Sequence, residues 1–207
     1  MDDIRVDCQG FRVGRWSFPP FVLRRGERFA LHMPSESRIN DRDQIIPALT
    51  GSAFIPGLTL HGSVVWAQYA QRSTGWRHWF SDQRPFAWLK RNTSLTDDAI
   101  ESILTEHNID RRFGLSCSGG NPKLILGLYA ALAQHPAVLV YETHGADPLG
   151  KVAAHQIVAR HLTQCAALFV SWPWICQGRE GRDEVPGAVS IPISDSDVAV
   201  RSVAAAQ

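Results

Sequence analysis

A chain of 207 residues with 44% hydrophobic residues is long enough for one compact domain and apolar enough to bury a substantial core. The 21 lysine and arginine residues nearly balance the 20 aspartate and glutamate residues, so the formal net charge is +1. This balance speaks against a nucleic-acid-binding protein, which usually carries a strong basic excess.

The cysteines and the apolar stretches exclude further classes. None of the four cysteines forms a C-x-x-C pair, so we expect neither a zinc site nor a disulfide framework, and a reducing compartment is the default. The acidic N-terminus, MDDIRVDCQG, has no apolar segment of the signal-peptide kind. The most apolar stretch, residues 124–141, is broken at 134–136, well short of the roughly 20 residues of a membrane span. The sequence therefore predicts a cytoplasmic protein without direct membrane insertion.

The first quarter of the chain is typical of β-structure. Residues 3–13 alternate between apolar and polar side chains, and residues 19–32 have the pattern of a strand, a turn and a second strand. A polar loop at 33–43 leads into an expected helix at 41–50. Pro47 lies inside this helix and should kink it or stop it early.

The second half alternates between strands and helices. Strands are expected at 62–70, 137–141 and 166–171, and helices at 94–106, 118–135 and 149–163. Residues 137–141 are wholly apolar, as in a strand buried on both faces. This alternation predicts an α/β core with parallel strands. The last residues, 194–207, are low in complexity and should be partly disordered.

Residues 118–142 carry the strongest motif. They read SGGNPKLILGLYAALAQHPAVLVYE, and THGADPLG follows. This stretch resembles the ATP-binding-cassette (ABC) ATPases: their signature motif, its helix, the Walker B strand that ends in the catalytic glutamate, and then the D-loop. Upstream, FVLRRGERFAL resembles the turn and strand before the family's phosphate loop, and PALTGSAFIPGLTLHGSV resembles the helix end and the hairpin that follow it.

The resemblance covers residues 3–193 and implies a fold. It is the α/β, P-loop NTPase-like fold of ABC nucleotide-binding domains, with a mixed sheet core and an N-terminal antiparallel β part. The implied organisation is a single domain over residues 1–207, with a shortened helical subdomain at about 84–117.

The phosphate loop is where the chain departs from the family. The motif G-x-x-x-x-G-K-[ST] uses glycines for close backbone approach to the phosphates, a lysine for the β- and γ-phosphates, and a hydroxyl for Mg²⁺. Here the corresponding segment reads MPSESRIN. The four defining positions are held by Met33, Arg38, Ile39 and Asn40, and Glu36 adds a negative charge. Loss of the lysine alone removes a charge-assisted contact worth roughly 1.5–3 kcal/mol. We therefore expect this loop to bind no ATP and the isolated chain to hydrolyse ATP poorly or not at all.

Of the other catalytic positions implied by the resemblance, some keep the family's residue and others do not. Glu142 stands at the general-base position and is a residual catalytic candidate, but it needs a bound γ-phosphate and Mg²⁺ to act. Tyr141 replaces the aspartate that supports Mg²⁺, and we interpret it as a half-buried strand-end tyrosine. Trp172 stands at the switch histidine, and His144 is interpreted as a surface residue. Gln83 takes the place of the Q-loop glutamine.

The signature segment is the best-preserved element. Ser118, Gly119, Gly120 and Asn121 precede a helix, whose N–H groups and dipole attract a phosphate. In this family two domains pair head to tail, so the segment would close over ATP held by a partner. The alternative reading is a helix cap with a tight turn. The D-loop is one residue short at 145–147.

Aromatic residues gather around Gln83. They are Trp66, Tyr69, Trp76, Trp79, Phe80, Phe86 and Trp88. In the family's transporters this region receives a helix of the membrane subunit, and an exposed aromatic patch would suit such docking. Ordinary core packing is the alternative.

The leading hypothesis is a degenerate nucleotide-binding subunit, peripheral to the membrane through its partners. It would pair with an active ABC ATPase subunit and a membrane subunit, and ATP with Mg²⁺ would bind only at the shared interface. The alternative is a purely structural subunit without a nucleotide role.

Two remote readings concern other chemistry. The segment GLSCS at 114–118 loosely resembles a serine-hydrolase nucleophile elbow, with Asp147 and His155 downstream in the right order. Its last position is serine instead of glycine, and no strand is expected directly before it. His155 and His161 are six residues apart, off the spacing that places two ligands on one helix face, so no metal site is expected.

Overall fold

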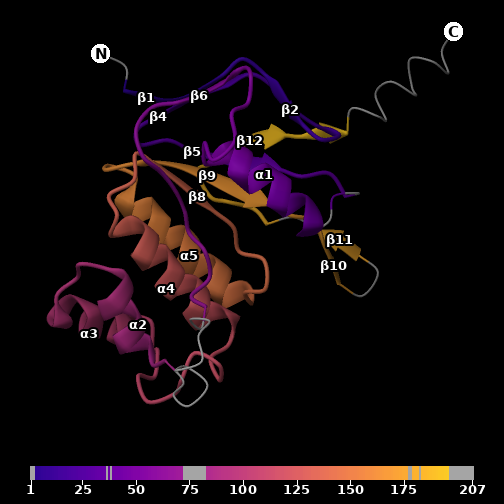
Figure 1. The fold of residues 1–207 in the computed structure, drawn as a ribbon. Helices are drawn as coiled ribbons and strands as arrows, with labels where there is room; N and C mark the ends of the chain where they lie inside the picture. The colour runs from indigo at the N-terminus through magenta and orange to yellow at the C-terminus, as the bar shows by residue number, and fades with distance from the viewer. Residues whose placement is uncertain are drawn as a thin grey trace, which may run out of the picture. The chain divides into compact units, whose positions relative to one another are not determined.

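The fold comes from a computed structural model, which describes residues 3–35, 37, 39–71, 83–176, 179–181 and 183–195. The chain separates into two compact units. The sheet unit comprises Met1–Trp66, Pro136–Glu142 and Leu162–Gln207, and the helical unit comprises Ala67–His135 and Thr143–His161. The expectation of a single domain stays a prediction, and we describe each unit by itself (Figure 1).

A five-stranded parallel sheet organises the sheet unit, in the order β12-β5-β9-β8-β7. Its strands are β5 (Arg28–His32), β7 (Val64–Trp66), β8 (Val138–Tyr141), β9 (Ala166–Ser171) and β12 (Val189–Pro192). All four strand pairs run parallel. The segments that follow these strands therefore leave from one edge of the sheet, which brings residues 33, 142 and 172 to the same edge.

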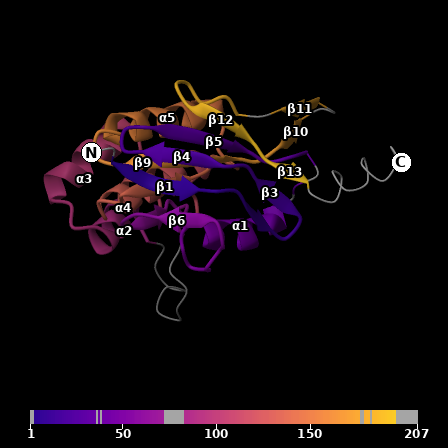
Figure 2. The same ribbon diagram turned by 90° about the horizontal axis from the view of Figure 1, so that it is seen from above.

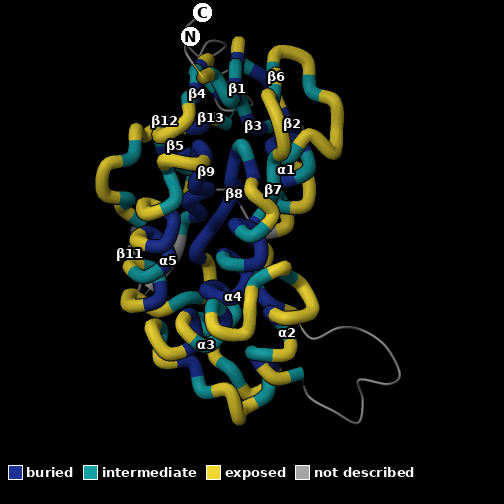
Figure 3. Tube along the Cα trace, turned by 90° about the vertical axis from the view of Figure 1, so that its left-hand side faces the viewer, coloured by how far each residue is buried: buried dark blue, intermediate teal, exposed yellow. Residues whose placement is uncertain are grey.

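The central strands are buried on both faces. Every residue of β8 and β9 is buried, and Figure 3 shows both strands as buried tube. β9 spans the expected residues 166–171, and β8 lies within the expected 137–141, so both predictions are confirmed. A continuous apolar run without alternation is the pattern of a strand covered on both sides.

The antiparallel strands form separate sheets. One has the order β4-β1-β6, visible in Figure 2, and contains β1 (Ile4–Cys8), β4 (Phe21–Arg24) and β6 (Leu58–Leu60). Another contains β2 (Phe11–Val13), β3 (Trp16–Phe18) and β13 (Ser194–Asp195), and β10 (Trp174–Cys176) pairs with β11 (Arg179–Gly181). The expected mixing of strand directions thus takes the form of a parallel sheet beside antiparallel ones.

The β-structure expected over 3–13 is confirmed and consists of two strands, because the chain turns at Gly10, whose φ of 92° suits glycine. Two other expectations about the β-structure need correction. The hairpin expected within 47–64 does not form, since β6 pairs with β1 while β7 pairs with β8. The strand expected over 62–70 shortens to β7.

Helix α1 (Arg42–Leu49) follows a 3₁₀ turn at Ile39–Asp41. The helix continues past Pro47 to Leu49, so the proline does not stop it at that position, and the expected kink stays a prediction. A proline inside a helix costs about 3 kcal/mol, yet α1 buries Ile45, Ile46, Ala48 and Leu49 in the hydrophobic core that both kinds of sheet share. Burial of each large aliphatic side chain is worth about 1.5–3 kcal/mol, so the packing outweighs the proline.

The helical unit contains α2 (Pro85–Asn92), α3 (Asp97–Glu106), α4 (Gly120–Leu132) and α5 (Pro148–His161). The helices predicted at 94–106, 118–135 and 149–163 are confirmed as α3, α4 and α5. Thr96 caps α3 by accepting from the Ala99 N–H at 3.3 Å. α4 packs against α5. No helix in the described ranges combines the length and apolarity needed to cross a bilayer.

Candidate functional site

Glu142 directly follows β8 at the carboxyl edge of the parallel sheet. Its side chain is 1% exposed. One carboxylate oxygen, Oε1, lies 2.7 Å from a guanidinium nitrogen of Arg42. The other, Oε2, accepts a hydrogen bond of 2.6 Å from the indole Nε1–H of Trp172. The residue that the resemblance places at the general-base position is therefore buried, with a hydrogen-bond donor at each oxygen.

Arg42 is the first residue of α1, and its side chain is 25% exposed. Its guanidinium carbon lies 4.5 Å from the ring centroid of Trp66, the last residue of β7. Such stacking adds a cation–π attraction to the ion pair. Trp172 follows β9 and is buried. We call Arg42, Trp66, Glu142 and Trp172 the carboxylate cluster; they come from α1 and from the ends of β7, β8 and β9.

A general base must receive a proton from the attacking water at one of its oxygens. In the carboxylate cluster both oxygens of Glu142 already face donors, and one donor is an arginine. A charge-assisted pair of this kind is short and about twice as strong as a neutral hydrogen bond. The arrangement is that of an internal ion pair.

The segment at the phosphate-loop position follows β5. Met33 is 0% exposed and belongs to the hydrophobic core. Its backbone N–H donates to the carbonyl of Ser171 at 3.0 Å, so this amide is committed to the sheet. Ser37 donates from both its N–H and its hydroxyl to the carbonyl of Pro34. Ile39 and Asn40 lie in the 3₁₀ turn, whereas Glu36 and Arg38 lie outside the described residues.

Tyr141 occupies the position expected to support Mg²⁺. It is fully buried, where a half-buried residue was expected, and its ring lies 5.1 Å from that of Phe169. Burial raises the pKa of the Tyr141 phenol, and the nearby Arg28 opposes this only in part. The side chain is therefore neutral at physiological pH and offers no carboxylate to a metal ion.

The signature segment lies in the helical unit. Gly119 is the N-cap of α4 with an extended backbone, and a Cβ added there would meet nothing within 4 Å. The Ser118 hydroxyl donates to the carbonyl of Gly114 at 3.0 Å. At Gly120, by contrast, a Cβ would lie 2.2 Å from the carbonyl oxygen of Gly145. One glycine therefore has open space around it, and the next is required for packing.

Asn121 connects the starts of α4 and α5. Its Oδ1 accepts from the backbone N–H of Asp147 at 3.0 Å, and the Asp147 carboxylate accepts from the N–H of Gly150 at 2.9 Å. The Gly150 N–H, with a contribution from Asn121, lowers the pKa of Asp147. The D-loop segment is thus fastened to the signature segment within the helical unit.

The remaining candidates are dispersed. Gln83 lies just before α2, and its backbone carbonyl accepts from Leu115 N–H at 3.0 Å. Trp66 belongs to the carboxylate cluster, and Trp88 Nε1–H donates to the carbonyl of Gln71 at 3.1 Å. Tyr69 and Phe86 are half-buried. Of the proposed docking aromatics, Trp76, Trp79 and Phe80 lie outside the described residues.

The serine-hydrolase reading lacks its structural context. The described residues 83–117 form helices and turns, so no strand leads into the elbow-like segment 114–118. Asp147 caps α5, and His155 is a buried residue of the same helix. The His161 Nδ1 lies 2.8 Å from the Ile157 carbonyl oxygen.

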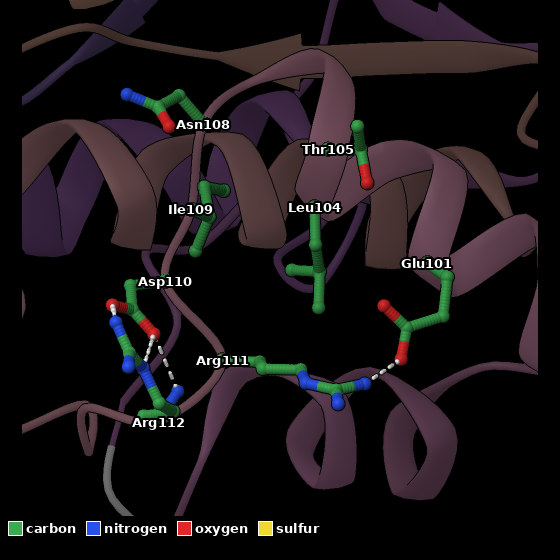
Figure 4. A pocket seen from close by; sticks show the side chains of 8 residues that line it. All are labelled: Glu101, Leu104, Thr105, Asn108, Ile109, Asp110, Arg111 and Arg112. Atoms are coloured by element: carbon green, nitrogen blue, oxygen red, sulfur yellow. Dashed lines mark hydrogen bonds and ion pairs between the residues drawn. The ribbon is translucent and has the colours of Figure 1, made fainter.

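An open pocket of about 410 Å³ lies at the end of α3, and none of its lining residues belongs to the motifs described above. Figure 4 shows its two arginines turned toward carboxylates: Arg111 pairs with Glu101 at 2.7 Å and Arg112 with Asp110 at 2.9 Å. With these cations neutralised, the pocket has no concentrated charge for a phosphate.

The local sequence pattern did not reveal the role of Arg42. The residue falls in a stretch interpreted as a polar loop running into a helix, and its partner Glu142 is 100 positions away. One signal was available: a carboxylate directly after an all-buried strand needs a cation, and Arg42 begins the helix that follows the degenerate loop.

Neither a family model nor a curated protein sequence matches this chain. Among solved structures, the chain is similar to the RNase-L Inhibitor, with a TM-score of 0.57 and 10% identity over 100% of this chain and 42% of that chain. It is also similar to cbiO1 from Clostridium perfringens, part of the ABC transporter complex cbiONQ, with a TM-score of 0.53 and 12% identity over 82% of this chain and 78% of that chain.

At these identities the likeness establishes the fold, which is that of ABC ATPase domains. This chain spans less than half of the RNase-L Inhibitor chain.

Proposed function

We propose that this chain is a degenerate nucleotide-binding subunit of an ABC transporter-like complex and hydrolyses no ATP on its own. The observation that carries the proposal is the state of Glu142: the residue at the catalytic position is buried, with Arg42 on one oxygen and Trp172 on the other.

The residues present do not fit ATP with Mg²⁺ at the chain's own loop. The Met33 side chain is in the core and its amide bonds to Ser171, so neither space nor an N–H is available for a phosphate at this position. The lysine and hydroxyl positions hold Ile39 and Asn40. Tyr141 replaces a carboxylate that a metal ion would need.

The active site of the proposed complex lies at a shared interface. An active ABC ATPase subunit would hold ATP and Mg²⁺, and this chain would present Ser118, Gly119, Gly120 and Asn121 from the α4 N-terminus. The open space at Gly119 and the backbone N–H groups of the first helical turn support this role. A membrane subunit would hold the pair at the cytoplasmic face, since cbiO1, which shares the fold, is part of a transporter complex.

A hydrolysis assay tests the first half of this proposal. The purified chain and its Glu142→Gln variant should release phosphate from MgATP at the same background rate. Magnesium-dependent hydrolysis by the chain that falls about a hundredfold or more in Glu142→Gln would show an active catalytic base and contradict the proposal.

The Gly119→Arg variant tests the second half. Gly119 has φ −68° and ψ −175°, which any residue adopts, so an arginine fits without backbone strain. In the complex purified from its native host, this variant should lower ATP hydrolysis at least about tenfold if Gly119 closes over the partner's nucleotide. Ser52→Arg, an exposed position in the sheet unit, is the matched control and should leave the rate unchanged.

A purely structural subunit is the second candidate. Ser118 and Asn121 both make contacts within the helical unit, as a cap and a link between helices would. This role predicts that Gly119→Arg and Ser118→Arg leave the partner's hydrolysis rate unchanged while the complex still assembles.

A further inference from the structure

A buried carboxylate is the starting point. Glu142 is 1% exposed, and an ionised carboxylate taken out of water costs several kcal/mol unless it is paired and hydrogen-bonded. In ATP-hydrolysing enzymes of this general kind, metal ions and bound phosphates supply or organise the charges at this edge of the sheet. Those groups do not fit the loop of this chain, so the compensation must come from elsewhere.

Arg42 is suited to compensate the charge of Glu142. Its guanidinium reaches Glu142 at 2.7 Å and stacks on Trp66 at 4.5 Å, so the cation is held from two sides. A guanidinium is always charged and loses less entropy in a fixed geometry than a lysine would. Trp172 completes the arrangement by donating to the second oxygen.

The pair also joins separate parts of the sheet unit. Arg42 begins α1, Trp66 ends β7, Glu142 follows β8, and Trp172 follows β9. Removing one partner of a buried ion pair leaves the other charge uncompensated, which destabilises much more than loss of an exposed pair does.

We infer that Arg42 is the internal counter-ion of Glu142 and compensates its buried charge. The pair thereby stabilises the carboxyl edge of the sheet in one conformation that requires neither a nucleotide nor a metal ion. This inference concerns the sheet unit alone. It does not depend on whether the signature segment binds ATP held by a partner. The inference about Arg42 and the proposed function can therefore be contradicted independently.

Thermal unfolding of matched variants tests whether the Arg42–Glu142 pair stabilises the sheet unit. Arg42→Met keeps the aliphatic stem and should lower Tm by about 10 °C. The Tm of Arg42→Lys should lie between those of the wild type and Arg42→Met, because lysine keeps the charge but loses the planar stacking on Trp66. The double variant Arg42→Met with Glu142→Gln should be more stable than Arg42→Met alone, since no buried charge is left unpaired. Arg111→Ala is the control: its pair with Glu101 has the same 2.7 Å distance but is exposed, and its loss should shift Tm by no more than about 2 °C.

Chemical rescue separates a counter-ion from a packing residue. Arg42→Ala should regain about half or more of its lost Tm in millimolar methylguanidinium, an effect that neither the wild type nor Arg42→Ala/Glu142→Gln shows. Loss of stability in Arg42→Met no larger than in Arg111→Ala, or additive effects of Arg42→Met and Glu142→Gln, would overturn the inference. A Tm of the wild-type chain that rises by several degrees with Mg²⁺ alone would overturn it as well.

Discussion

The carboxylate cluster and the signature segment belong to the same ATPase-type fold, yet their surroundings are opposite. At the carboxylate cluster, side chains of this chain fill the positions around Glu142. At the signature segment, a Cβ added to Gly119 would meet nothing within 4 Å, although Gly120 and Asn121 are tightly packed. In the proposed degenerate subunit, the difference teaches that the two regions have different requirements. The buried charge of Glu142 must be compensated, whereas a helix N-terminus of small residues needs no compensating group.

The largest expected effect is at Gly120, and the neighbouring Gly119 provides the contrast. Gly120→Val should destabilise the chain by about 3 kcal/mol, because its Cβ would lie 2.2 Å from the Gly145 carbonyl oxygen and the backbone would have to move. Gly119→Val should change the free energy of unfolding by no more than about 0.5–1 kcal/mol. Urea unfolding followed by circular dichroism measures both; equal effects would mean that the signature segment is not open at Gly119.

The second test removes the neutral hydrogen-bond donor of the carboxylate cluster, the indole N–H of Trp172. Trp172→Phe keeps most of the aromatic packing but removes the hydrogen bond to Glu142 Oε2, and bonds to charged groups are worth about 1.5–3 kcal/mol. The expected loss of stability is therefore about 2 kcal/mol by denaturant unfolding. In the background of Glu142→Gln, where the acceptor is neutral, the same substitution should cost less. A loss in the wild-type background below about 0.5 kcal/mol would show that Trp172 only fills space.

The smallest expected effect concerns the cap of α5. The pKa of Asp147 is lowered in the folded state, so its contribution is complete above the unfolded pKa near 3.9 and is lost as pH falls through the folded pKa. At pH 7, Asp147→Ala should be slightly less stable than the wild type, and this difference should shrink as the pH falls below about 4. A difference that stays constant over that range would mean that the carboxylate does not act as the cap.

The sequence was informative where patterns are local. The apolar run 166–171 predicted β9 residue for residue, and the cap with two aspartates predicted α3, which begins at Asp97 within the expected range 94–106. The ordered motifs also singled out Glu142 and the loop at Met33, whose proposed roles stay predictions. In each case the decisive signal lies within about ten residues, which propensity and periodicity can capture.

Non-local choices were beyond the sequence. Nothing in the segment 47–64 shows that β6 joins β1 while β7 joins β8, because both partners lie far away in the chain. The helix α1 passes Pro47 because its neighbours are buried by tertiary packing. The pairing of Arg42 with Glu142 depends on strand order, which brings chain segments 100 residues apart to one edge of the sheet.

The central claim is that the chain's own site is closed to nucleotide. Calorimetric titration of the purified chain with MgATP, at concentrations that would detect millimolar binding, tests it most directly. We predict no heat of binding, in the wild type and in Arg42→Met alike, since Ile39 stands at the lysine position of the loop and the buried Met33 at its first glycine position. Micromolar binding to the isolated wild-type chain would contradict the account, because the nucleotide would then be held by contacts other than those of the degenerate loop.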